Sequence, residues 1–204
     1  MLNGARPGMY WQLYDYYKQP NAAYYGVKKA NAPVQLIYDY YNKAVYAVNE
    51  TLETAKLKAT MKLLKGSNAA EDAKQIEVAP GTVIKVFDID IAEAPAAFLF
   101  LKLKDGDNEV ATNEYFIPAG NDVYDWSKTA WVNTPITKYA SYAMLDGLCS
   151  NKCEIDVNKG EDTYRVTVYN PTDKVAFMVR LTARDKQGNL ICPAYWSDNY
   201  LTLA

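Results

Sequence analysis

A strict two-residue alternation between residues 54 and 64 is the feature that most constrains how this chain can fold. Lysine or threonine occupies the even positions from 56 to 62, and lysine side chains normally lie in water. The odd positions are apolar: Ala55, Leu57, Ala59, Met61 and Leu63. Successive side chains of a strand point to opposite faces, so this pattern predicts an antiparallel strand with one face in a core and the other in solvent.

Short segments with the same period surround this strand. Between residues 34 and 117 we expect about seven strands, because turn-forming residues interrupt the apolar segments at 42–43, 80–81 and 105–108. We expect the polar run 66–73 to be a loop. Strands of this length and density predict an immunoglobulin-like β-sandwich.

A second β segment follows Pro118 and Gly120, and we expect it to form a second sandwich over residues 118–204. Its expected strands lie near 126–139, 153–157, 164–169, 174–185 and 190–196, with hairpin turns at 170–173 and 186–189. An apolar segment at 200–203 comes directly before Ala204. We expect this segment to be a strand.

One helix is expected near the start of the chain. Pro20 suits a first helical position, and Ala23, Val27 and Ala30 recur at helical spacing before Pro33 ends the run. A single short helix cannot bury its own apolar face, so we expect it to pack on the strands that follow or to fray. The sequence contains no internal repeat that is visible by residue identity.

Charge and composition exclude several classes of protein. A net charge of −2 gives no basic surface for nucleic acid or for an anionic membrane. No apolar run approaches the roughly 20 residues that span a bilayer. The chain has no histidine, which removes the commonest general base and metal ligand, so we expect neither a metal nor another cofactor.

Several long segments resemble one family of glycosidases. They lie at 1–3, 9–17, 23–31, 125–139 and 196–200, and they include Trp11, Trp126 and Trp131. Together they resemble bacterial exo-β-D-glucosaminidases, which belong to the family-two glycoside hydrolases with the β-mannosidases. The resemblance implies a mainly β chain, with residues 1–33 as the end of a (β/α)8 barrel and two immunoglobulin-like sandwiches at 34–117 and 118–204. In the family another strand follows the point that corresponds to residue 204, so the resemblance also implies that the second sandwich lacks its final strand and has an open edge.

The resemblance also implies a function and a location. The chain would be a C-terminal, non-catalytic accessory part that braces the missing catalytic barrel of a parent enzyme acting on oligosaccharides. Both catalytic glutamates of the family lie on barrel strands before the segment present here, so the chain alone is expected to be inactive. By the same resemblance, the parent would be periplasmic or extracellular in bacteria.

Three residues are expected to remain from the sugar-pocket loop: Asn3, Arg6 and Trp11. The family motif there is Asn-Asn-Ala-Trp-Pro-Ser, and its tryptophan lines the sugar pocket. Arg6 stands in the place of that tryptophan. A charged side chain cannot offer the apolar surface on which a sugar ring packs, so the substrate of the parent is open.

The remaining acidic and sulfur-containing residues give weak signals. A retaining glycosidase holds two carboxyl groups about 5 Å apart. Asp88 and Asp90 alternate on a strand and are best explained as a solvated strand face, whereas the aspartates at 105 and 107 suit a turn. Cys149 and Cys153 lie close in sequence, and both a disulfide and two free thiols are open interpretations.

Trp126 and Trp131 have two possible roles, and each role implies a different function. Large aromatic residues near a domain boundary usually pack between domains, which favours an accessory module. The alternative is an autonomous carbohydrate-binding module, in which such residues form a platform for glycans. Surfaces without their natural neighbours, near Trp11 and residues 200–203, also predict self-association as a homodimer.

Overall fold

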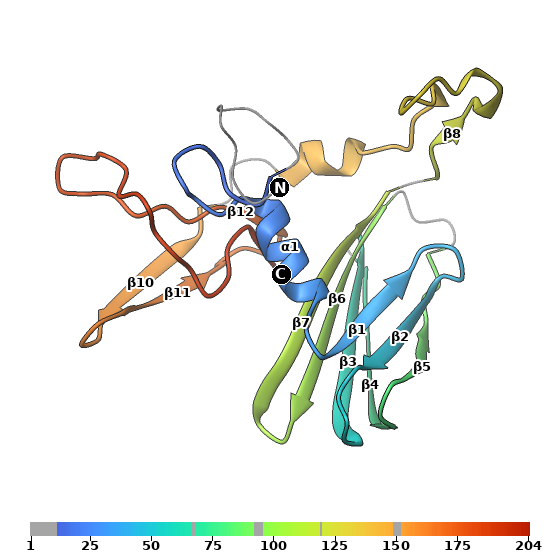
Figure 1. Cartoon of the computed structure of the whole chain (residues 1–204), viewed down its shortest axis with the longest axis horizontal. Coiled ribbons are helices and arrows are strands. Elements are labelled where there is room, and N and C mark those ends of the chain that lie inside the picture. The colour runs from blue at the N-terminus through green and yellow to red at the C-terminus, as the bar shows by residue number, and fades with distance from the viewer. Residues whose placement is uncertain (1–11, 67, 92–95, 119, 149–151) are drawn as a thin grey trace. The chain divides into compact units, whose positions relative to one another are not determined.

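The computed structural model describes residues 12–66, 68–91, 96–118, 120–148 and 152–204. These residues form two compact units (Figure 1). The central unit comprises the described residues of 31–147, and the split unit combines those of 1–30 with those of 148–204. The boundaries predicted at residues 33 and 117 stay predictions.

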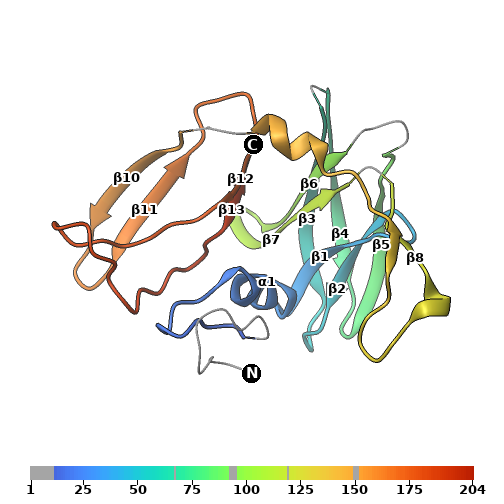
Figure 2. The same cartoon turned by 90° about the horizontal axis from the view of Figure 1, so that it is seen from above.

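Two antiparallel sheets build the central unit. The first has the order β1 (Val34–Asp39), β2 (Ala44–Asn49) and β5 (Thr82–Asp88). The second has the order β4 (Asn68–Val78), β3 (Ala55–Lys65), β6 (Ala97–Asp105) and β7 (Asn108–Ile117). Figure 2 shows these strands as two layers. They confirm the seven-stranded β-sandwich predicted for this region.

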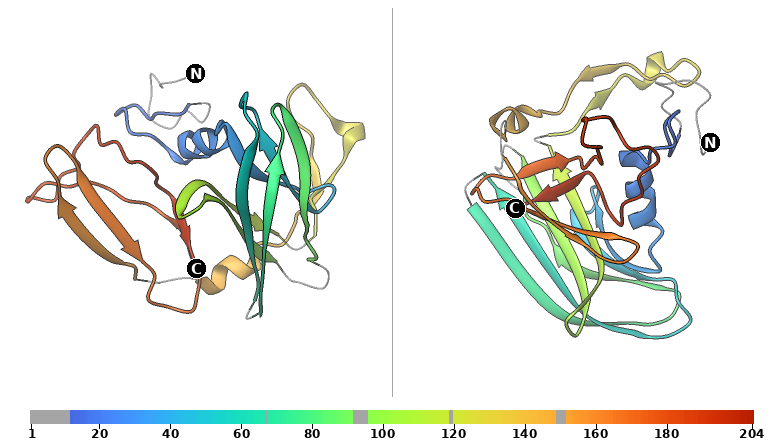
Figure 3. Two further views of the ribbon diagram at one scale, coloured as in Figure 1. Left: turned by 90° about the horizontal axis from the view of Figure 1, so that it is seen from below. Right: turned by 90° about the vertical axis from the view of Figure 1, so that its left-hand side faces the viewer.

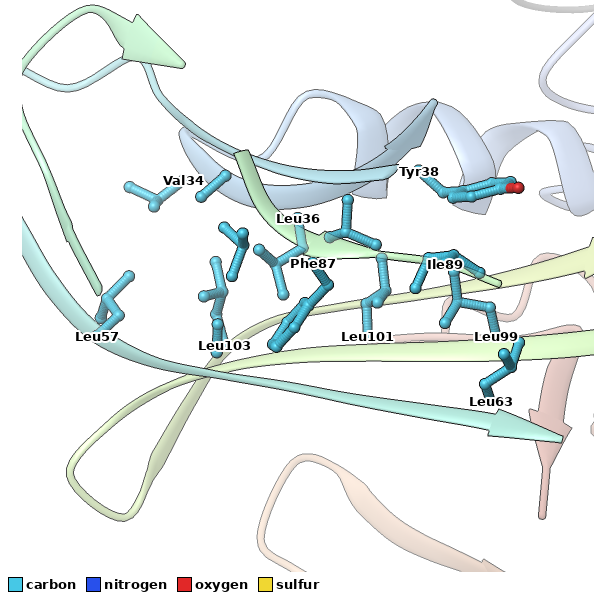
Figure 4. Packing of buried hydrophobic residues seen from close by; sticks show 14 of the residues in the cluster. Val34, Leu36, Tyr38, Leu57, Leu63, Phe87, Ile89, Leu99, Leu101 and Leu103 are labelled. Carbon is cyan, nitrogen blue, oxygen red and sulfur yellow. The ribbon is translucent and has the colours of Figure 1, made fainter. Parts of the chain in front are cut away.

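Apolar side chains from both sheets fill one core between the layers (Figure 4). Phe87 on β5 lies among Leu101 and Leu103 of the opposite sheet, and each of the three is almost completely buried. On β3, Leu57 is buried whereas Lys56 is exposed, as the alternation predicted. Burial at about 25 cal/mol per Å² of apolar surface makes this core the main stabilising contribution to the central unit.

The run 66–73 was predicted to be a loop, and this prediction is wrong. Most of it belongs to β4, which pairs with β3 from Val78 back to Asn68. β4 is an edge strand whose side chains are nearly all in solvent, so it needs no apolar alternation. Its backbone hydrogen bonds hold it, and ion pairs such as Lys56–Glu77 at 3.5 Å lie across the strand pair.

A buried asparagine links the two sheets at one end of the sandwich. Asn49 closes β2, has no exposed surface, and donates its side-chain amide to the carbonyls of Glu53 (2.8 Å) and Val78 (2.9 Å). Its oxygen accepts from the backbone and the hydroxyl of Thr51, at 3.0 and 2.7 Å. Because Val78 ends β4, one side chain ties a strand of the first sheet to a strand of the second.

The same arrangement occurs in the split unit. Asn170 follows β11 (Tyr164–Tyr169) and donates to the carbonyls of Lys174 (2.7 Å) and Leu203 (3.2 Å). Its oxygen accepts from the backbone and the hydroxyl of Thr172, at 3.2 and 2.8 Å. The two asparagine corners, centred on Asn49 and Asn170, are a structural repeat that residue identity did not reveal.

The β structure of the split unit consists of two separate pairs of strands. β10 (Glu154–Lys159) pairs with β11, and β12 (Ala176–Val179) pairs with β13 (Leu201–Leu203). The strands expected near 164–169 and 200–203 are present, but 190–196 contributes only a single bridge, between Arg184 and Leu190. Every residue of β10 is exposed, so little apolar area holds this hairpin to a core.

The predicted helix is present as α1 (Ala22–Ala30), and it packs within the split unit. Asn21 caps it by accepting from the backbone of Tyr24 at 3.1 Å, so Pro20 precedes the cap instead of opening the helix. Tyr25 is 2% exposed, with its ring centroid 6.2 Å from that of Tyr200. Sequence analysis did not identify this neighbour, which comes from the other end of the chain.

Replacing Asn49 with aspartate should destabilise the central unit by about 3 kcal/mol or more at pH 7, because a buried carboxylate would face two carbonyl oxygens. The loss should shrink as the pH falls, since the folded state raises the pKa of that carboxyl and its protonated form can donate again. Urea denaturation at pH 7 and pH 5 measures both effects. Asn108→Asp, in an exposed hairpin turn, is the control; equal losses in both variants would contradict the role of the corner.

Tyr25→Ala should detach α1 from the split unit while the central unit stays folded, because the truncation removes the most deeply buried side chain of the helix. Hydrogen exchange should then lose protection in α1 and β13 but not in β3 or β6. Tyr17→Ala, at an exposed position of the same segment, serves as control. Unchanged protection of α1 in the Tyr25 variant would disprove this packing.

Candidate functional site

The predicted sugar-pocket remnant, Asn3, Arg6 and Trp11, lies outside the described residues. Cys149 also lies outside them, and Cys153 is a half-buried free thiol in the structure. The pocket remnant and the Cys149–Cys153 bridge therefore stay predictions. The other predicted residues, Trp126 and Trp131, fall within the central unit.

Both tryptophans lie on an extension of the central unit that we call the arm, residues 123–138. It contains β8 (Val123–Tyr124), a short 3-10 helix (Trp126–Lys128) and β9 (Ile136–Lys138), with β8 and β9 paired. Figures 1 and 3 show this segment, in yellow, leaving the body of the two sheets. Because the arm is only two strands wide, it has no core of its own.

Polar contacts set the shape of the arm. Asp125 pairs with Lys128 at 2.8 Å and accepts from the hydroxyl and the backbone of Ser127, at 2.5 and 3.2 Å. The contact with Lys128, followed by those with Ser127, holds the pKa of its carboxyl below the usual range. At the tip, Ala130 and Asn133 exchange backbone hydrogen bonds of 2.9 and 3.0 Å. The arm is therefore a defined hairpin.

The apolar side chains of the arm point into solvent. Trp126 is 73% exposed and Trp131 is 94% exposed, and Val132 beside it is exposed as well. Trp131 also has a φ of 51°, in the left-handed region that bulky residues seldom adopt. Such a conformation costs about 1–2 kcal/mol, so the hairpin tip presents a tryptophan at an energetic cost and not as a result of core packing.

A cavity of about 500 Å³ opens at the end of the central sandwich that is opposite Asn49. The β1–β2 turn, the start of β6, the end of β7 and the segment 118–142 enclose it. Four tyrosine side chains line it: Tyr38, Tyr40, Tyr124 and Tyr142. Polar side chains line it as well: Lys43, Asn121 and Asp122.

The tyrosine rings that line the cavity pack against other aromatic rings. The ring centroid of Tyr40 lies 4.8 Å from that of Tyr38 and 6.1 Å from that of Tyr115, in edge-to-face geometry. Tyr142 stacks on Phe116 at 5.8 Å with an interplanar angle of 28°. Burial raises the pKa of the Tyr40 phenol, with a smaller contribution from Tyr115, so its hydroxyl is neutral at physiological pH.

Among the described residues that line the cavity, Asp122 is the acidic one. Its Oδ1 accepts the backbone N–H of the buried Ala140 at 2.8 Å, which fixes the carboxylate in place. Within the described part of the chain, its Oδ2 makes no hydrogen bond, so this oxygen can accept one from another molecule. Sequence reasoning missed this site, because its walls come from segments about 100 residues apart.

The acidic groups considered for catalysis form no such site. Asp88 is exposed and pairs with Lys85, as a solvated strand face predicts. Asp105 pairs with Asn108 at the hairpin between β6 and β7, which confirms the predicted turn. No group of three or more metal-ligating side chains occurs among the residues that the structure describes, and no helix there is long and apolar enough to cross a membrane.

Two family models match the chain. The exo-β-D-glucosaminidase Ig-fold domain matches residues 131–204, and the mannosidase Ig/CBM-like domain matches residues 42–119. They support the prediction of two immunoglobulin-like domains in a mainly β chain. The origin of α1 in a barrel stays a prediction.

Curated relatives extend the match to the whole chain. Exo-β-D-glucosaminidases of Arthroderma benhamiae and Hypocrea jecorina are 34% and 30% identical to it, over 212 and 218 residues. The alignments cover 100% of this chain but 24% of each relative. The chain therefore spans about a quarter of the length of the curated relatives it matches.

Solved structures agree. The exo-chitosanase CsxA of Amycolatopsis orientalis superimposes with a TM-score of 0.84 at 28% identity, covering 100% of this chain and 26% of that one. The β-D-mannosidase of Dictyoglomus thermophilum gives a TM-score of 0.63 at 20% identity over 98% of this chain and 22% of that one, which is a likeness in fold alone. Taken together, these matches show that the chain comprises two immunoglobulin-like domains of the kinds found in exo-β-D-glucosaminidases and β-mannosidases.

Proposed function

We propose that the chain is a non-catalytic accessory part of a larger glycosidase that acts on β-linked glucosaminides or mannosides. Its role is to brace the catalytic barrel. Residues 1–33 are the end of that barrel in this proposal, and the whole protein is periplasmic or extracellular. The relatives leave room for a barrel, since the chain accounts for 24% of their length.

Trp131 is the observation that carries the bracing role. A tryptophan that is 94% exposed at the tip of a hairpin, in a left-handed conformation, gains nothing from the central unit itself. Trp126 and Val132, on the same arm, are exposed as well. Clustered exposed apolar side chains of this kind are typical of surfaces that pack against another protein part.

The carboxylates support a non-catalytic role for the chain. A retaining glycosidase needs two carboxyl groups about 5 Å apart, one of them a nucleophile. Asp88 is held by Lys85, Asp125 by Lys128, and Asp122 by the backbone of Ala140. Each of these three acidic groups therefore has a structural partner.

The isolated chain should not hydrolyse nitrophenyl β-glucosaminide, β-mannoside or β-galactoside, because the two catalytic glutamates are expected on barrel strands that precede this segment. The measurement is release of nitrophenol over several hours, compared with a heat-inactivated sample. Turnover that persists through a second purification and co-elutes with the chain would refute the non-catalytic assignment.

Trp126→Ala combined with Trp131→Ala should lower the melting temperature of the larger protein, since the arm would lose its apolar contacts with the barrel. The same pair of changes should leave the isolated chain within about 0.5 kcal/mol of its original stability, because both side chains are exposed there. Calorimetry on both proteins measures the contrast.

Tyr41→Ala is the matched control for the arm. Tyr41 is also an aromatic residue with 92% exposure, but it lies in the β1–β2 turn and not on the arm. It should leave the melting temperature of both proteins unchanged. If the double tryptophan variant behaves like Tyr41→Ala in the larger protein, the arm does not brace the barrel.

A further inference from the structure

We propose that the cavity at the end of the central sandwich binds a neutral saccharide ring. This inference goes beyond bracing, because it concerns a different surface from the tip of the arm and requires no barrel. A volume of about 500 Å³ lies within the range of about 300–1,000 Å³ that is usual for small-molecule sites.

Two partly exposed aromatic rings give the cavity a surface suited to a sugar. Tyr40 is 55% exposed and Tyr142 is 50% exposed, and both line the cavity. The weakly polarised C–H groups on the face of a pyranose ring are attracted to the negative face of an aromatic ring. Contacts with Tyr38 and Phe116 hold these two rings in place, so little side-chain entropy is lost when a ligand packs on them.

The charges on the wall indicate which ligand is favoured. One anionic group, Asp122, and one cationic group, Lys43, line the cavity, so it presents no net charge from these side chains. A phosphate would face the Asp122 carboxylate, and an amine would face the Lys43 ammonium. A neutral molecule that both donates and accepts hydrogen bonds satisfies the two groups together, and a ring with several hydroxyls does so.

The geometry of Asp122 favours a hydroxyl donor. Its Oδ1 is held by the N–H of Ala140 at 2.8 Å, which orients Oδ2 without using it. A charged acceptor strengthens a hydrogen bond from a hydroxyl roughly twofold over a neutral one. The amide of Asn121 and the hydroxyl of Tyr142 provide further donors and acceptors on the same wall. The hydroxyl of Tyr40 donates to the carbonyl of Phe116 at 3.4 Å and can accept a hydrogen bond.

The test uses the isolated chain and three neutral disaccharides, namely cellobiose, β-1,4-mannobiose and N,N′-diacetylchitobiose, with protonated glucosamine as the charged comparison. Two-dimensional amide NMR should show saturable shifts at residues 38–43, 96–97, 120–124 and 140–142, and not at the tip of the arm, with at least one neutral disaccharide at concentrations up to about 10 mM. Glucosamine should bind more weakly.

Three variants test whether the shifts come from a sugar bound in the cavity or from a general change in folding. Tyr142→Ala should weaken binding by up to about tenfold, since it removes one ring from the wall. Asp122→Asn should weaken it several-fold while keeping an oxygen for the N–H of Ala140. Tyr41→Ala, next to Tyr40 but outside the cavity wall, should not alter binding, and the amide spectra themselves report whether each variant is folded.

Several outcomes would overturn the proposal. They are the absence of shifts with all three neutral disaccharides, shifts that map away from the cavity, shifts that are as large in Tyr142→Ala as in the original chain, and tighter binding of glucosamine. None of these outcomes bears on the thermal contrast between the arm variants, so the saccharide site and the bracing role can fail independently.

Discussion

The structure of the central unit depends on one buried side-chain amide. Asn49 lies at the end of β2, opposite Val34 at the start of β1, and it donates to Val78 at the end of β4. It therefore closes one end of the sandwich and fixes how the two sheets face each other. With that end closed, the β1–β2 turn lies at the other end, where Tyr38 and Tyr40 line the cavity. The position of the candidate site thus follows from the strand register that the asparagine corner helps to fix.

Two features of the central unit carry the functional proposals, and they differ in physical character. The cavity consists of rings whose positions are fixed by neighbouring rings, as in Tyr142 on Phe116. In the arm, by contrast, polar contacts hold the backbone, and the aromatic side chains of Trp126 and Trp131 are exposed to solvent. Preorganised concave sites suit small ligands, whereas exposed apolar side chains suit a large surface. One domain can therefore offer a saccharide site and a docking surface without conflict between them.

Sequence patterns predicted those parts of the fold in which burial imposes a period. β3 was predictable because Leu57 and Leu63 face the core while Lys56 faces water. β4 was missed because an edge strand in solvent shows no such contrast. The cavity could not be predicted, since Tyr40 and Asp122 come together only through the tertiary fold. The corner at Asn170 shares with that at Asn49 only the asparagine and the threonine two residues later, which is too short a match to indicate a repeat in the sequence.

The split unit combines two segments from opposite ends of the sequence, and this affects the order in which the chain folds. The side chain of Gln19 bonds the carbonyl of Ile191, across 172 residues of sequence, and Lys29 pairs with Asp198 at 3.1 Å. The central unit lies between these partners in sequence and needs neither of them for its core. During synthesis it can fold as soon as residues up to 147 have left the ribosome, whereas α1 must wait for residues beyond 190. Until then Tyr25 lacks the ring of Tyr200 beside which it packs, so the docking of α1 is a late, long-range step in the folding of the split unit.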